Sequence, residues 1–102
     1  MIQKQAVKKK ADQVKVTFVL PREQADGPVV VLGDFNDWED GGLPLRKSGA
    51  DWKASVTLET GHRYTFRYRR DNGEWFNDPG ADGYEPNEYG GHDCVIDLTN
   101  TP

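Results

Sequence analysis

Cysteine is nearly absent from this sequence, and so are long apolar runs. The single cysteine, Cys94, allows no internal disulfide and is typical of a protein in a reducing compartment. No stretch approaches the roughly 20 apolar residues of a membrane span. No apolar stretch of signal-peptide length follows the basic N-terminus. We therefore expect a cytoplasmic protein that has no membrane as a partner.

The sequence also lacks the residues of common catalytic and metal sites. It has two histidines, His62 and His92, and no Gly-x-Ser-x-Gly motif, so a nucleophilic triad is not expected. The segment from Asp34 is similar to the opening of a calcium loop, but Trp38 occupies a ligand position and Leu45 stands where the loop requires Glu. We expect no enzyme activity, no metal and no cofactor.

Basic residues are scarce outside the first 16 residues, which contain five lysines and one acid. Residues 17–102 contain eight basic and sixteen acidic residues, a net charge of −8. A segment with this net charge repels a polyanion, so we do not expect nucleic acid as a partner. Residues 1–12 are Lys-rich and unpatterned, which predicts a flexible arm ahead of one domain at 13–102.

The sequence does contain a series of short strands separated by turns. Apolar and polar residues alternate over 13–20, 52–59 and 63–69, the pattern of strands with one buried face. Val29–Leu32 is a continuous apolar run that is typical of a buried strand. Further strands are expected at 43–47, 75–76 and 94–98, with a long loop at 78–91. About seven antiparallel strands predict an all-β fold, an immunoglobulin-like β-sandwich.

The three tryptophans fall into two groups. Trp52 is in register with the apolar positions of its strand, so we expect it in the core. Trp38 and Trp75 each follow a turn rich in Asn, Asp and Gly. If Phe35 folds back onto the core, Trp38 projects elsewhere. These two indoles form either a platform for stacking a sugar ring or a cap on the sandwich edge, and the residues alone leave both open.

Several motifs together are similar to those of a known family. The segments that carry the similarity are Gly33–Trp38, Gly61–Tyr68, Asp71–Trp75, Asn77–Pro79 and Tyr89–Ile96. They resemble the isoamylase early-set, or glycogen-binding, carbohydrate module of branching and debranching enzymes and of the AMP-activated protein kinase β subunit. The resemblance covers about Val14 to Leu98, is closest to the free-standing bacterial type, and implies an early-set immunoglobulin-like sandwich.

The resemblance also implies binding of α-1,4-linked glucan without catalysis. Members of the family stack the sugar on two tryptophans, which correspond to Trp38 and Trp75 here. They add a basic residue from the intervening strand, which corresponds to Arg67, or to Thr65 if an insertion is placed differently. The other candidate carbohydrate-binding positions are Asn36, Tyr89, His92 and Asp93.

Two positions near the last strand depart from the family pattern. Gly91 replaces a Thr and Asp93 replaces an Asn, which removes a hydroxyl and a hydrogen-bond donor. His92 is a candidate substitute for the lost donor.

The sequence leaves two functions open. One is a non-catalytic module of the glycoside-hydrolase-associated type that binds α-glucan, as polysaccharide or oligosaccharide. The alternative is a protein-interaction or regulatory domain that retains the fold without strong sugar binding, with a protein as its partner.

Overall fold

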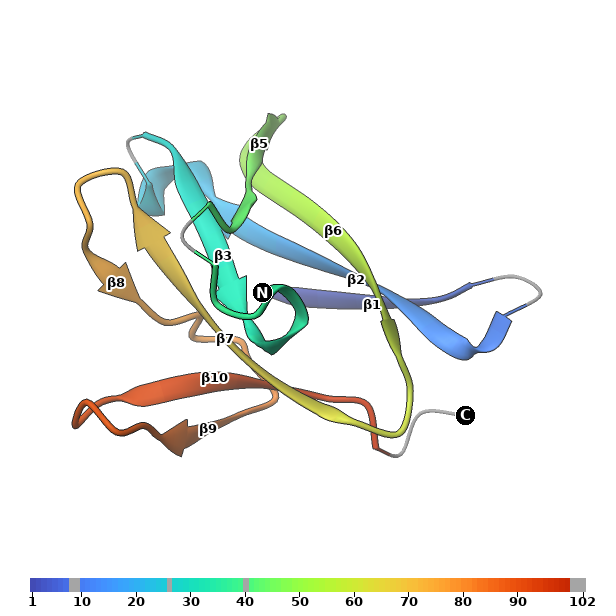
Figure 1. The fold of residues 1–102 in the computed structure, drawn as a ribbon. Helices are drawn as coiled ribbons and strands as arrows, with labels where there is room; N and C mark the ends of the chain where they lie inside the picture. The colour runs from blue at the N-terminus through green and yellow to red at the C-terminus, as the bar shows by residue number, and fades with distance from the viewer. Residues whose placement is uncertain (8–9, 26, 40, 100–102) are drawn as a thin grey trace.

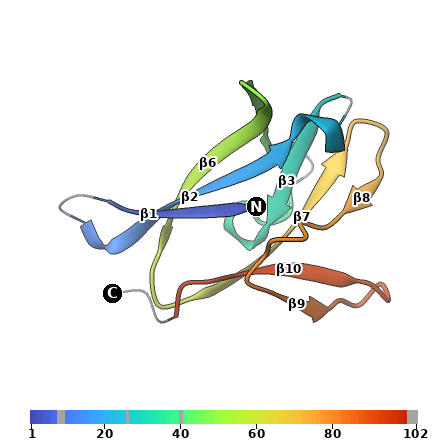
Figure 2. The same cartoon turned by 180° about the vertical axis from the view of Figure 1, so that it is seen from behind.

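Two antiparallel sheets make up the fold in the computed structural model, which describes residues 1–7, 10–25, 27–39 and 41–99 (Figure 1). The first sheet has the order β1 (Ile2–Val7), β2 (Lys10–Pro21), β6 (Asp51–Glu59) and β5 (Arg46–Ser48). The second has the order β4 (Leu43–Pro44), β3 (Val29–Gly33), β7 (Arg63–Arg70), β10 (His92–Asp97) and β9 (Gly83–Pro86). In addition, β8 (Trp75–Phe76) pairs with β7 (Figure 2). Two short 3₁₀ helices, η1 (Arg22–Gln24) and η2 (Asp34–Asn36), follow β2 and β3.

This architecture confirms the all-β sandwich expected from the sequence. The described residues form ten strands where about seven were expected, because the segment 43–47 is divided and two strands were not foreseen. One is β9, which lies in the expected long loop and pairs with β10. No helix in the described part of the chain has the length and apolar content that crossing a membrane demands.

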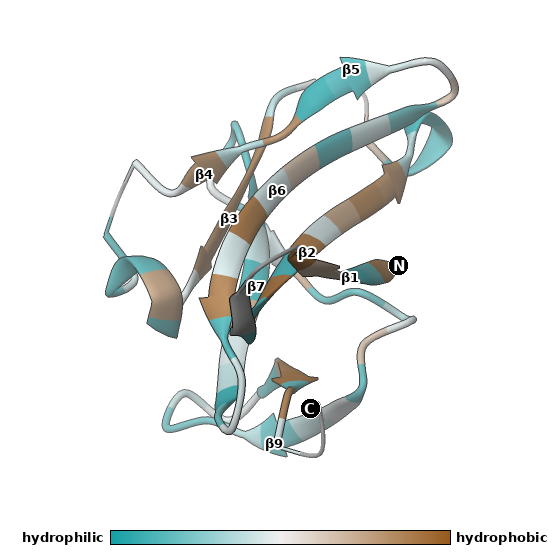
Figure 3. Ribbon diagram, turned by 90° about the vertical axis from the view of Figure 1, so that its right-hand side faces the viewer, coloured by the Kyte–Doolittle hydropathy of each residue, from teal (hydrophilic) through white to brown (hydrophobic). Residues whose placement is uncertain are grey.

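The core lies between the sheets and is built by alternation along the strands, which Figure 3 shows for β2 and β6. Phe18 of β2 contacts Phe66 of β7 edge-on, with ring centroids 5.0 Å apart. Trp52 is 8% exposed, and its Nε1 donates a 3.2 Å hydrogen bond to the carbonyl oxygen of Ala25. The core position expected for Trp52 is therefore confirmed.

The N-terminal segment differs from the flexible arm expected from its composition. Ile2–Val7 pairs antiparallel with β2 and forms an edge of the first sheet. The second strand begins at Lys10, inside the expected arm, so the expected boundary at residue 13 falls within β2. Charged residues are common on edge strands, which explains why a Lys-rich composition concealed one. Lys8 and Lys9, also part of the expected arm, lie outside the described residues.

Lys4 ties this edge strand to the second sheet. Its Nζ lies 2.6 Å from the carboxylate of Asp82 and donates a 3.3 Å hydrogen bond to the carbonyl oxygen of Asp97. Asp82 in turn accepts a 2.8 Å hydrogen bond from the backbone N–H of Asp97. An ion pair therefore joins the two sheets beside β1.

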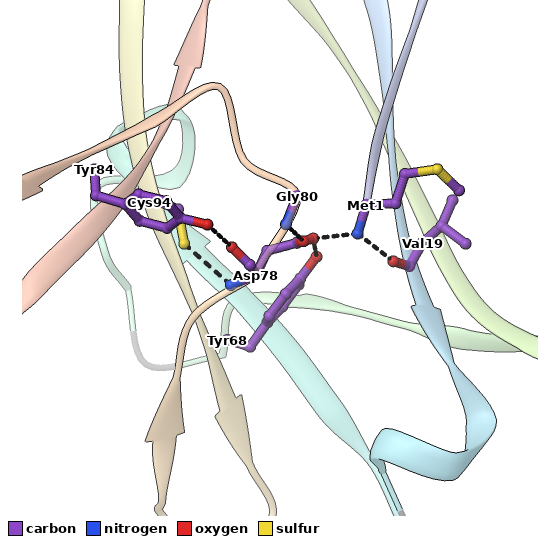
Figure 4. A network of polar contacts seen from close by, with 7 residues as sticks. All are labelled: Met1, Val19, Tyr68, Asp78, Gly80, Tyr84 and Cys94. Atoms are coloured by element: carbon purple, nitrogen blue, oxygen red, sulfur yellow. Dashed lines mark hydrogen bonds and ion pairs between the residues drawn. The ribbon is translucent and has the colours of Figure 1, made fainter.

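A buried carboxylate forms a second connection to the N-terminal strand (Figure 4). Asp78 has no exposed surface, and its Oδ2 accepts hydrogen bonds from the hydroxyl of Tyr68 at 2.7 Å and from the amino group of Met1 at 2.5 Å. Its Oδ1 accepts from the backbone N–H of Gly80 at 2.7 Å. A buried charge is stable only when it is paired and hydrogen-bonded, and Asp78 meets both conditions.

Two further side chains complete this network. The hydroxyl of Tyr84 donates to the carbonyl oxygen of Asp78 at 2.5 Å, and the backbone N–H of Asp78 donates to Sγ of Cys94 at 3.2 Å. Cys94 is fully buried, and this burial raises the pKa of its thiol to about 11. The cysteine is therefore a protonated core residue at neutral pH, as expected for a lone cysteine in a strand.

Candidate functional site

The turn after β3 separates its two aromatic residues. Phe35 stacks on Phe18 of the core, with ring centroids 5.7 Å apart. Asn36 holds the turn closed, because its Oδ1 accepts from the backbone N–H of Gly33 and its Nδ2 donates to the carbonyl oxygen of Val31, both at 3.0 Å. Trp38 then emerges on the other side, as expected if Phe35 folds back. The amide of Asn36 is engaged in the turn, so its assignment as a sugar contact stays a prediction.

Trp38 has an unusual backbone conformation. Its φ is 56° and that of Asp37 is 55°, so two consecutive residues other than glycine are left-handed. For a bulky residue this conformation costs about 1–3 kcal/mol, and it persists only where the surroundings determine it. The backbone N–H of Trp38 donates a 3.0 Å hydrogen bond to the carbonyl oxygen of Gly33, which closes the turn. Strain of this kind clusters at binding sites.

The turn places Trp38 beside Trp75 of β8. The two ring centroids are 6.5 Å apart and the ring planes are inclined by 43°. Trp75 is 40% exposed, whereas Trp38 is partly buried. We call Trp38 and Trp75 the indole pair. The structure thus brings together the two tryptophans that the sequence motifs singled out.

The indole pair lies at the outer face of the second sheet, the face that carries Thr65, Arg67 and Arg69 of β7. These three residues alternate along the strand with Phe66 and Tyr68, which are fully buried in the core. The Cζ atoms of Arg67 and Arg69 lie 5.9 and 5.6 Å from the ring centroid of Trp75. Two guanidinium groups therefore flank the more exposed indole.

The outer face is partly covered beside β7. Leu32 is in register with Arg67 and Val95 with Thr65, so both share this face, yet they are only 1% and 2% exposed. A Cβ built on Gly42 would lie 3.2 Å from Cγ of Leu32, so the backbone after Trp38 packs directly on β3. This packing holds the loop of Trp38 against the outer face.

Two side chains fix the polar groups around the indole pair. Asn77 accepts a 2.9 Å hydrogen bond from Nε of Arg67 and donates one of 2.8 Å to the carbonyl oxygen of His92. Asp34 accepts a 3.1 Å bond from the indole N–H of Trp38 at Oδ1. Its Oδ2 accepts from the backbone N–H and the hydroxyl of Thr65, at 2.8 and 3.0 Å. Of the two alternatives, Arg67 and Thr65, only Arg67 therefore lies against Trp75 among the described contacts.

Fewer contacts connect the indole pair to the residues expected near the last strand. Tyr89 lies in the turn between β9 and β10 and is 87% exposed. Alternation along β10 puts Asp93 on the outer face and His92 on the same side as the buried Cys94. In the described part of the chain no ring contact joins Tyr89 or His92 to the indole pair. Their roles, and that of Asp93, stay predictions.

Asn87 shapes the turn that carries Tyr89. Its Oδ1 accepts from the backbone N–H groups of Tyr89 and Gly91, both at 3.0 Å. Its Nδ2 donates a 3.1 Å hydrogen bond to the carboxylate of Asp93. Asp93, at the position where the family has an Asn, is therefore used inside the hairpin.

Three residues of the site were not foreseen from the sequence: Asp34, Asn77 and Arg69. Each lies within or beside a motif that was recognised, at 33–38, 77–79 and 61–68. Their position within or beside these motifs was the available signal. It does not identify the hydrogen-bond partners of Asp34 and Asn77, which are four to 31 positions away in sequence. Within the described ranges, no group of three His, Cys, Asp or Glu side chains is arranged to hold a metal ion.

A comparison with protein families identifies the domain. Residues 6–81 match the model of carbohydrate-binding module 48, the isoamylase N-terminal domain. The chain belongs to this family. The match includes the indole pair, Arg67 and both residues that fix them, whereas Tyr89, His92 and Asp93 lie beyond it. The family resemblance read from the sequence motifs is therefore confirmed, and the domain is a carbohydrate-binding module.

Solved structures support the fold of this module 48 domain. One match is the crystal structure of the enterobactin esterase FES from Shigella flexneri in the presence of enterobactin, with a TM-score of 0.68 and 14% identity. The alignment covers 99% of this chain and 34% of the esterase, so the chain spans about a third of that protein. At this identity the similarity concerns the fold alone. A comparison with curated proteins finds no match.

Proposed function

We propose that this carbohydrate-binding module binds α-1,4-linked glucan at the indole pair and catalyses no reaction on it. The observation that carries the proposal is the inclination of the two ring planes by 43°, at a centroid distance of 6.5 Å. A flat, ribbon-like polysaccharide suits coplanar aromatic rings, whereas the curved chain of an α-1,4-glucan suits two faces that are inclined to one another. Each indole offers an apolar face to the C–H groups of one glucose ring.

Arg67 supplies the polar part of the proposed site. Its guanidinium lies 5.9 Å from the ring centroid of Trp75, measured at Cζ, and its Nε is fixed by Asn77. A guanidinium has several other N–H donors, which serve the hydroxyl groups of a sugar stacked on Trp75. Because Asn77 fixes the side chain before a ligand arrives, little rotamer entropy is lost on binding.

Binding to short chains is expected to be weak. A disaccharide of about 23 heavy atoms at roughly −0.3 kcal/mol per atom gains at most about −7 kcal/mol, which corresponds to a Kd of about 10 μM. Polysaccharide offers many equivalent segments, so retention is stronger there than affinity for a short oligosaccharide suggests. A cytoplasmic α-glucan store is the ligand that we propose, consistent with the single buried thiol.

Native electrophoresis through gels containing glycogen, amylopectin or cellulose tests the proposal. We expect retardation by the two α-glucans and none by cellulose. Trp38→Ala and Trp75→Ala should each weaken binding by roughly 1–3 kcal/mol, or about 5- to 150-fold, by analogy with stacking on other flat ligands.

A matched pair of arginine variants controls for charge. Arg67→Ala should reduce retardation, whereas Arg46→Ala should not, because Arg46 is an exposed residue of β5 in the first sheet. If the wild type migrates unretarded in both α-glucans, the sugar proposal fails. The alternative, a protein-interaction domain that retains the fold, then takes its place.

A further inference from the structure

We propose that Asp34 positions Trp38 for ligand stacking, an inference that rests on the proposed function. Asp34 is the first residue of η2, directly after β3. Its Oδ1 accepts the 3.1 Å hydrogen bond of the Trp38 indole, and its Oδ2 accepts both hydrogen bonds of Thr65, at 2.8 and 3.0 Å. One carboxylate therefore connects the Trp38 ring to β7, the strand that carries Arg67.

This connection determines the direction of the ring. Packing against a flat apolar surface permits an indole to rotate, whereas a hydrogen bond from Nε1 selects one orientation. Trp38 needs such a constraint, because it follows a 3₁₀ turn and has a left-handed backbone with φ 56°. With its N–H held by Asp34, the ring lies 6.5 Å from that of Trp75. Fixing the ring before binding reduces the entropy lost when a sugar stacks on it.

A carboxylate is suited to this role in a way that an amide is not. Both oxygens of a carboxylate accept hydrogen bonds, and Asp34 uses one for Trp38 and the other for Thr65. An Asn at this position has a single acceptor oxygen and directs an NH₂ group toward one of the two donors. With the carboxylate's geometry, it can accept from the indole of Trp38 or from the backbone N–H of Thr65, but not from both.

The variants Asp34→Ala and Asp34→Asn test the proposal, with Asp37→Asn as the control. Asp37 lies in the same turn, and its exposed side chain makes none of the hydrogen bonds found in the described residues. Replacing it by Asn removes one negative charge and keeps a residue that tolerates φ 55°. Asp34→Leu has nearly the native size and shape but no acceptor, so it carries the test if Asp34→Ala does not fold.

The first readout is the indole N–H signal of Trp38 in the ¹H–¹⁵N spectrum of the free protein. In Asp34→Ala this signal should move upfield and exchange faster with solvent. The signal of Trp52 should stay in place, since its N–H donates to Ala25 inside the core. Asp37→Asn should leave both signals unchanged. An unchanged Trp38 signal in Asp34→Ala overturns the proposal.

The second readout is affinity for maltoheptaose. Losing a hydrogen bond to a charged group is expected to weaken binding about tenfold in Asp34→Ala, with a smaller loss in Asp34→Asn. In a Trp38→Phe background, which has no indole N–H, Asp34→Ala should add less than about twofold. A further tenfold loss in that background means that Asp34 acts by another route, and overturns the proposal.

The two proposals fail in different ways. If the wild type does not bind maltoheptaose, glycogen or amylopectin, the proposed function is wrong. The indole signal then still decides whether Asp34 holds Trp38. If the wild type binds and Asp34→Ala binds equally well, the function stands and the positioning role is wrong.

Discussion

The hydroxyl of Tyr68 donates a 2.7 Å hydrogen bond to the carboxylate of Asp78, and neither side chain has exposed surface. Tyr68 lies in β7 between Arg67 and Arg69, which flank the indole of Trp75. Asp78 follows Asn77, which fixes Arg67. The same two segments therefore carry the proposed binding face on one side and a buried polar connection on the other.

Removing the buried carboxylate is expected to be strongly destabilising. Asp78→Ala leaves the Tyr68 hydroxyl and the Met1 amino group without their acceptor, so we expect a loss of about 3–5 kcal/mol in the free energy of unfolding. Tyr68→Phe, which removes one donor, should cost about 1–3 kcal/mol. Urea unfolding monitored by fluorescence measures both.

Tyr64→Phe is the matched control for the loss of that hydroxyl. Tyr64 lies on the same strand, but its hydroxyl donates to the carbonyl oxygen of Glu59 at an exposed position. We expect a change below about 1 kcal/mol. Equal effects of Tyr64→Phe and Tyr68→Phe would contradict a special role for the Asp78 network.

Alkaline pH should destabilise the protein through the same cluster. Burial raises the pKa of the Cys94 thiol from 9.0 to about 11, and burial together with the nearby Asp78 charge raises the pKa of Tyr68. Between pH 9 and 11 the unfolded thiol loses its proton while the folded thiol keeps it. The free energy of unfolding therefore falls as the pH rises, by on the order of 2 kcal/mol for Cys94.

Cys94→Ala isolates this contribution, because alanine does not titrate. The variant is expected to be less stable than the wild type at pH 7, since it leaves a cavity in the core. The difference should narrow as the pH approaches 11. A constant difference in unfolding free energy from pH 7 to 11 would show that the thiol does not contribute to the pH dependence of stability. Urea denaturation at several pH values makes the comparison.

The long strands could be predicted because their signal is local. Alternation over β2, β6 and β7 follows directly from the two faces of a sheet, and it correctly placed Trp52 in the core. The strand β1 could not be found in this way, because it is held by pairing with β2 and by contacts to residues more than 70 positions away. The strand β9 was hidden among Gly and Pro residues for the same reason: its partner is β10.

The candidate site could likewise be predicted only in part. The motifs pointed to Trp38 and Trp75, but their 6.5 Å separation depends on how the turn after β3 meets β8. Asp34 and Asn77 were missed because a short polar residue in a turn has many possible partners. Asn36, which was predicted to contact sugar, has its amide engaged within the turn, and its sugar contact stays a prediction. For Asp34 and Asn77 the deciding hydrogen bonds reach partners 10 to 31 positions away, which local patterns do not contain.

Deleting residues 1–7 should lower the free energy of unfolding by more than about 2 kcal/mol, the scale of a packing loss. The deletion removes Ile2 from the core, the pairing of β1 with β2, and the Met1 amino group from Asp78. A loss below about 0.5 kcal/mol would instead be typical of a flexible arm. Thermal unfolding of the two proteins decides between these outcomes.

A milder change tests the ion pair of β1 by itself. Lys4→Gln removes the charge that contacts Asp82 at 2.6 Å, and both side chains are about a third exposed, so we expect a loss below about 1 kcal/mol. Lys15→Gln is the control, because Lys15 is exposed on the adjacent strand and has no ion pair among the described residues. The loss for Lys4→Gln should shrink in 1 M salt, because salt screens the ion pair. Equal effects of Lys4→Gln and Lys15→Gln on stability would show that the ion pair contributes nothing.

Trp52→Ala and Trp75→Ala should separate folding from binding. Trp52 is 8% exposed within the core, so its truncation should cost about 3–5 kcal/mol in unfolding free energy. Trp75 is 40% exposed and packs against Arg67, Arg69 and Trp38, so its removal should cost about 1 kcal/mol from lost cation–π and ring contacts. Thermal unfolding beside glycogen-gel retardation makes the comparison. If Trp75→Ala destabilises the fold as much as Trp52→Ala, the indole pair is a structural cap of the sandwich, and its exposure does not mark a sugar platform.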